Sequence, residues 1–192
     1  MKNYHTHENL KKITFIICYI LLTSCQSSIE INSSKSSLQD KGYKKSLAEH
    51  TRKANLSDDF NIMFTIYASS LNNKFFKVLK EKYYEIFPQS QKSDDTIIQK
   101  INNKTAFIVS IYSPDNNLLN IKNKKQWNIY LEENNKNLTF PLSIISLKKT
   151  DSWDSFFPFI NNWTKDYLII FDNNKAKKLI LSSPRGKAKL FW

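Results

Sequence analysis

Residues 60–67 read Phe-Asn-Ile-Met-Phe-Thr-Ile-Tyr, so a large apolar side chain stands at every second position. The residues of this apolar series are Phe60, Ile62, Phe64 and Ile66. Because successive side chains of a strand point to opposite faces, the four would share one face. The period of two therefore predicts a β-strand with one buried face.

Two later segments carry the same signal. Residues 105–112 are mostly β-branched and aromatic, the composition typical of strands. Trp127, Ile129 and Leu131 occupy alternate positions of another segment and are expected on one buried face of a strand.

The C-terminal part predicts a meander of three strands. Segments 166–171, 178–181 and 187–192 are separated by residues that favour turns, including Pro184 and Gly186. Strands separated by short turns commonly pair in chain order, so we expect the first segment to pair with the second and the second with the third. About seven strand segments in all predict a β-sandwich.

One stretch has a helical period instead. Ser70 can cap the start of a helix there, and Pro88 would end it. Between them, apolar residues recur at spacings of three and four: Leu71, Phe75, Val78, Leu79, Tyr83, Ile86 and Phe87. A helical turn is also expected at 96–101. The predicted fold is mainly β, with one inserted α-helix near 70–87.

Composition limits the range of partners. The 192 residues carry a net charge of +12, yet the chain has only two arginines, Arg52 and Arg185. Proteins that read phosphates specifically favour the arginine fork, so nucleic acid is not an expected partner. The excess lysine is interpreted as a solvated basic surface, or as one that favours anionic lipid head groups or cell-wall polymer.

The first 25 residues have the pattern of an export signal. Lys2, Lys11 and Lys12 precede an apolar run over 13–22. At about ten residues, that run has the length of a signal-peptide core and is too short to span a bilayer as a helix.

The run ends in Leu22-Thr23-Ser24-Cys25, which resembles the lipobox of bacterial lipoproteins. The resemblance implies that residues 1–24 are a signal peptide and that Cys25 becomes the first residue and carries lipid, palmitate included. Two or more acyl chains would anchor the protein stably to a membrane. In enteric sorting rules, Gln26 after the cysteine favours the outer membrane. An ordinary secretory signal cut elsewhere, or a cytosolic chain with an apolar start, is the alternative.

Residues 25–55 are interpreted as the lipidated cysteine and a flexible tether. This stretch is rich in Ser and Lys and holds few large apolar residues, so it offers little surface to bury. A short helix near Leu47 and Ala48 is compatible with it. The single folded domain is expected over 56–192.

Catalytic motifs are scarce. Without the leader, no cysteine but Cys25 remains, and the one histidine, His50, is expected to be exposed in the tether. The adjacent acid pairs Asp58-Asp59, Asp94-Asp95 and Glu132-Glu133 would not converge, because neighbours on a strand point to opposite faces. We therefore predict a protein that is not an enzyme, with no catalytic residue, metal or cofactor.

Six aromatic residues crowd into residues 153–167, a region called the aromatic corner below. Packing in the core would account for them; if Trp153 and Phe156 were exposed, they would form a platform for a partner or a glycan. The residues named as candidates for binding are Trp153, Phe156, Phe157 and Trp163.

Two functions follow as hypotheses. The first is a lipoprotein of the cell envelope that acts as a non-catalytic binding or structural accessory domain with an envelope protein partner, for example in a secretion assembly. The alternative is a periplasmic lipoprotein that binds a glycan or lipid through the aromatic corner. An envelope hydrolase is disfavoured by the scarcity of His and Cys.

Overall fold

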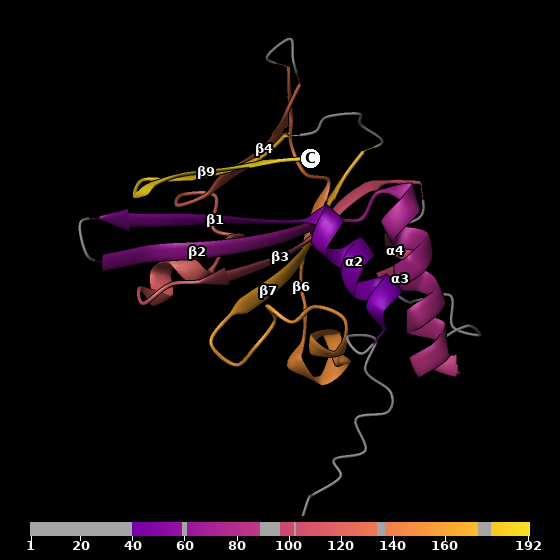
Figure 1. The fold of residues 1–192 in the computed structure, drawn as a ribbon. Coiled ribbons are helices and arrows are strands. Elements are labelled where there is room, and N and C mark those ends of the chain that lie inside the picture. The colour runs from indigo at the N-terminus through magenta and orange to yellow at the C-terminus, as the bar shows by residue number, and fades with distance from the viewer. Residues whose placement is uncertain (1–39, 59–60, 89–96, 102, 134–136, 173–177) are drawn as a thin grey trace, which may run out of the picture. The chain divides into compact units, whose positions relative to one another are not determined.

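A computed structural model describes residues 40–58, 61–88, 97–101, 103–133, 137–172 and 178–192 of the chain. Within these ranges nine strands form two antiparallel sheets with three α-helices, which confirms the predicted, mainly β, sandwich fold (Figure 1). The signal peptide, Cys25 and the stretch to residue 39 lie outside the described ranges.

The first sheet has five strands in the order β1-β2-β3-β7-β6, each antiparallel to its neighbours. Their bounds are β1 Thr51–Asp58, β2 Asn61–Ser70, β3 Thr105–Tyr112, β7 Lys165–Phe171 and β6 Ser143–Ser146.

The second sheet has four strands in the order β5-β4-β8-β9, again antiparallel. Their bounds are β5 Leu138–Thr139, β4 Asn128–Glu132, β8 Lys178–Ser183 and β9 Gly186–Phe191.

The main core lies between the two sheets. Phe64 and Ile66 of the first sheet are fully buried, as their period of two predicted. The predicted buried face is wrong at Ile62, which is 52 % exposed because it lies at the far end of β2, where the pairing with β1 is irregular. Phe60 lies outside the described ranges. Trp127, Ile129 and Leu131 belong to the same core, which confirms the predicted face. Apolar side chains from facing sheets thus bury one another, as the sandwich architecture requires.

Three helices pack on the outer face of the first sheet over a second core. They are α2 Lys41–His50, α3 Asn73–Ile86 and α4 Ile97–Ile101, and short 3₁₀ turns lie at Asn116–Leu119, Lys149–Asp151 and Trp153–Ser155. Helix α3 confirms the predicted inserted helix. Its cap is Asn72, whose side chain accepts from the Phe75 N–H at 3.0 Å, and not Ser70, which ends β2.

The expected tether is wrong over 41–55, because α2 and most of β1 form there. Asp40 caps α2 by accepting from the Gly42 and Tyr43 N–H groups, and the buried Tyr43 and Leu47 attach the helix to the second core. Few apolar residues are enough to hold this segment in the fold, because α2 buries only one narrow stripe of side chains and β1 is an edge strand of its sheet.

The predicted meander is wrong at its first pairing. Strand β7 lies between β3 and β6 in the first sheet, whereas β8 lies between β4 and β9 in the second. Turn-forming residues indicate that a strand ends but do not select its partner. Six of the seven β7 residues are buried, so the strand requires a central position with both faces covered. The predicted pairing of β8 with β9 is confirmed.

Contacts between β1 and β9 join the sheets along one edge. The Arg52 Nε–H donates to the Phe191 carbonyl at 2.8 Å, and the Trp192 indole N–H donates to the His50 carbonyl at 2.6 Å. The first bond joins the edge strands of the two sheets, and the second joins the residue after β9 to the end of α2, so both hold the sandwich together at that edge.

Candidate functional site

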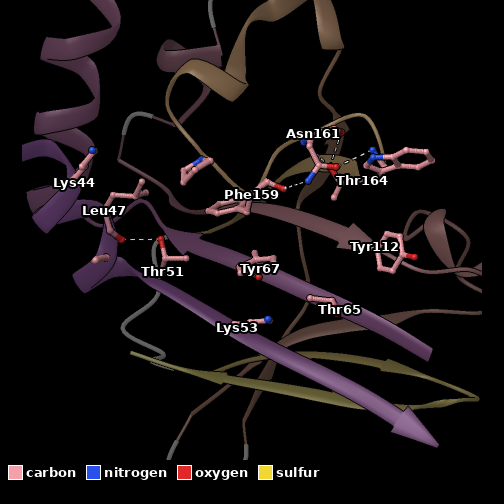
Figure 2. Close-up of a pocket in the computed structure, with 13 residues that line it drawn as sticks. Lys44, Leu47, Thr51, Lys53, Thr65, Tyr67, Tyr112, Phe159, Asn161 and Thr164 are labelled. Atoms are coloured by element: carbon pink, nitrogen blue, oxygen red, sulfur yellow. Dashed lines mark hydrogen bonds between the residues drawn. The ribbon is translucent and has the colours of Figure 1, made fainter. Parts of the chain in front are cut away.

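The helices cover only part of the outer face of the first sheet. In Figure 1, α2 lies at one end of β1 and β2, with α3 beside it on the side away from these strands, and the other end of both strands extends beyond the helices. Beside this uncovered part is an open groove of about 1170 Å³ between α2 and the loop at 158–164 (Figure 2). Its lining residues are Lys44, Leu47, Ala48, Thr51, Lys53, Thr65, Tyr67, Tyr112, Pro158, Phe159, Asn161, Trp163 and Thr164.

The floor of the groove is aromatic. The rings of Tyr67 and Phe159 are stacked, with centroids 5.3 Å apart and planes 3° from parallel. Lys53 is paired with Tyr67 in the β1–β2 register, and its Nζ lies 5.2 Å from the Tyr67 ring centroid. A flat apolar surface therefore lies directly beside a positive charge.

The loop at 158–164 forms one wall and presents an indole to solvent. Trp163 is 78 % exposed, although its backbone is held: its N–H donates to Asn161 Oδ1 at 2.8 Å. The Asn161 N–H in turn donates to Thr164 Oγ1 at 3.1 Å. Since the backbone is held in place, ordering it on binding would cost little entropy.

A buried carboxylate anchors this wall to the sheet. Asp166 of β7 accepts hydrogen bonds from Ser110 Oγ at 2.6 Å and from Thr164 Oγ1 at 2.8 Å. Its other oxygen receives the Lys149 ammonium at 2.7 Å, and Lys149 also donates to the Asn161 carbonyl. The acid is satisfied on both oxygens, so its role is to position the loop.

The charges of the groove are of one sign. Lys44 and Lys53 line it, and no lining residue is acidic. Neither lysine forms an ion pair with any residue that the structure describes. The lining thus offers aromatic faces, hydroxyl and amide groups and two ammonium groups, which is the chemistry for holding an anionic ligand.

The structure separates the four residues predicted for binding. Trp153, Phe156 and Phe157 are buried in the second core and form no exposed platform, whereas Trp163 lies on the groove. The four candidates therefore divide into three core residues and one exposed indole. Sequence reasoning missed Lys53 and Tyr67; the only available signal was their position opposite the buried face of their strands.

His50 is structural. It ends α2, is buried, and stacks on Phe75 with ring centroids 5.3 Å apart. Its Nδ1 lies 2.7 Å from the Ser46 carbonyl oxygen. The expectation of an exposed tether histidine is therefore wrong, because α2 extends to this residue and packs against α3.

Among the described residues, no group of three or more His, Cys, Asp or Glu side chains is placed to hold a metal ion. Of the acid pairs considered above, Glu132 accepts from Lys178 Nζ at 2.6 Å, and this bond lowers the pKa of the Glu132 carboxyl. The Asp94-Asp95 pair lies outside the described ranges, as does Asp59.

In the portion of the chain with described coordinates, no helix combines the length and apolar character needed to cross a bilayer. Comparison with family models, curated proteins and solved structures gave no match. Function is therefore inferred from the chemistry of the groove and from the leader pattern.

Proposed function

We propose that this chain is a lipid-anchored, non-catalytic binding protein of the bacterial cell envelope, and that the groove binds an anionic glycan. The observation that carries the proposal is an open aromatic groove with two unpaired lysines and no acid. It favours the ligand-binding hypothesis over a purely structural role.

The shape of the groove favours a glycan over an acyl chain. An acyl chain gains affinity by leaving water completely, which requires an enclosed cavity. A sugar ring has apolar faces and polar edges, so it can stack on Tyr67 or Trp163 while its hydroxyl groups stay solvated. Lys44 and Lys53 would then bind carboxylate or phosphate groups along the glycan.

Binding can be tested with two oligosaccharides of equal length, oligogalacturonate as the anionic probe and malto-oligosaccharide as the neutral one. We expect calorimetry to detect the anionic probe, with binding that weakens as salt rises. The double variant Lys44→Gln, Lys53→Gln should weaken it by roughly 5- to 20-fold, since each exposed ion pair contributes up to about 1 kcal/mol.

The matched control is Lys41→Gln, Lys45→Gln. It removes the same charge from exposed positions of α2 that do not line the groove. Equal losses in both double variants, or no binding of the anionic probe, would refute the groove as a site for anionic glycans.

Anchoring is tested separately at Cys25. The chain should incorporate labelled palmitate and stay with the membrane fraction after a high-salt wash, whereas Cys25→Ala should incorporate none and be released. Gln26 supports the outer membrane as the location. Palmitate labelling that persists in Cys25→Ala would refute the proposed lipid site.

A further inference from the structure

A second exposed surface lies where the chain crosses from the second sheet to the first. Between β5 and β6 stand Phe140, Pro141 and Leu142, called the apolar turn here. The side chain of Phe140 is 56 % exposed and that of Leu142 is 61 % exposed. Single exposed apolar residues are ordinary on a protein surface, but two large ones on either side of a proline make this turn a candidate contact surface.

The apolar turn is attached to both sheets. The Leu142 N–H donates to the Ile170 carbonyl of β7 at 2.8 Å. On the other side, Phe140 contacts Tyr130 of β4 with ring centroids 6.2 Å apart. The exposure of these side chains is built into the fold, because pairing of β5 with β4 and of β6 with β7 fixes the backbone on either side.

Two lysines share the hollow beside this turn. Lys122 and Lys124 line a depression of about 610 Å³ together with Phe140 and Leu142, and no acidic residue lines it. Both lysines are exposed, and neither is ion-paired with any described side chain. The hollow has no lining residue in common with the groove.

We infer that the apolar turn and these two lysines dock on an anionic lipid bilayer. Phe140 and Leu142 enter the boundary between head groups and acyl chains, and Lys122 and Lys124 meet the lipid phosphates. Charge complementarity selects this occupant, because exposed apolar groups beside unpaired cations match the head-group region of an anionic bilayer. This contact is independent of the glycan groove and would orient the domain on the membrane that carries it.

The test places a fluorescent reporter at the turn. The full chain carries Cys18→Ser and Cys25→Ser, so that Leu142→Cys alone accepts an environment-sensitive fluorophore. Vesicles contain either phosphatidylcholine alone or phosphatidylcholine mixed with phosphatidylglycerol. The control reporter is Asn162→Cys, an exposed position in the loop beside the groove.

We expect a blue shift and protection from iodide quenching at residue 142 on anionic vesicles, with no such change at residue 162. Adding Lys122→Gln and Lys124→Gln should raise the lipid concentration for half-maximal shift by about 25-fold, since each lysine near an anionic surface contributes roughly fivefold. The control substitutions Lys41→Gln and Lys45→Gln should raise this lipid concentration far less.

An unshifted reporter at residue 142 would overturn the inference, and so would equal shifts on neutral and anionic vesicles. The fluorophore reports only on its own surroundings. Attachment of the chain to a vesicle through its leader would therefore not by itself shift the emission at residue 142. Neither outcome bears on glycan binding, so the two proposals fail separately.

Discussion

Trp127→Ala should be among the most damaging single substitutions in this protein. The side chain is 3 % exposed, lies edge-on to Phe64 with centroids 5.4 Å apart, and donates its indole N–H to the Leu118 carbonyl at 3.1 Å. Truncating a buried Trp costs about 3–5 kcal/mol through lost burial and the cavity left behind. The orphaned Leu118 carbonyl adds about 1 kcal/mol, for a total of about 4–6 kcal/mol.

Urea unfolding followed by near-ultraviolet circular dichroism measures this loss, with thermal unfolding as a second readout. For a domain of about 150 residues the melting temperature should fall by about 10–20 °C. The matched control is Trp163→Ala, which removes the same side chain from an exposed position and should change stability by less than about 0.5 kcal/mol. If the two variants lost similar stability, or if Trp127→Ala cost less than about 1 kcal/mol, the assigned core would be incorrect.

Three further substitutions probe other parts of the fold. Asp166→Ala should lower the free energy of unfolding by about 2–4 kcal/mol and weaken the proposed glycan binding, because it frees the loop that carries the exposed indole. Retained stability in urea unfolding together with retained affinity in calorimetry would contradict this role. Gly186→Ala should cost about 1–3 kcal/mol in urea unfolding, since φ is +149° there and an added Cβ would lie 2.4 Å from Leu56 Cδ2; an unchanged midpoint would exclude that strain. Hydrogen bonds from Lys82 and from the Tyr43 and Gly42 N–H groups together lower the pKa of Asp40 from 3.8 to about 2. Asp40 therefore stabilises the fold above about pH 4, and this contribution is lost as the pH falls toward 2. The wild type should therefore be more stable than Asp40→Asn at about pH 5, with the difference shrinking by about pH 2.5, and a constant difference would show that Asp40 does not contribute in this way.

Local patterns in the sequence were sufficient to predict the individual elements. The period of two around Phe64 predicted β2, and the spacing of three and four around Phe75 and Leu79 predicted α3. Both patterns are direct consequences of backbone geometry, which places every second residue of a strand, or every third or fourth residue of a helix, on the same face. For the same reason Trp127 could be assigned to the core before its neighbours were known.

Local patterns in the sequence could not predict which distant segments pair or bury one another. Strand β7 pairs with β3 and β6, although β8 follows it in the chain, because only a central position covers both of its apolar faces. The division of the aromatic corner has the same origin. Phe156 and Trp163 are equally apolar in the sequence, but only one of them lies beneath α3 in the second core.

The sequence by itself determined the leader pattern, the prevalence of strands, the inserted helix and the faces that strands and helix bury, since each depends on residues within about one element of one another. The tertiary structure alone decided where the groove lies. Its lysines come from α2 and β1, its floor from β2 and the loop at 158–164, and its exposed Trp163 from that same loop. These segments meet because α2 lies at one end of β1 and β2 and the loop at 158–164 packs beside Tyr67, and no local period in the sequence encodes which distant segments come together.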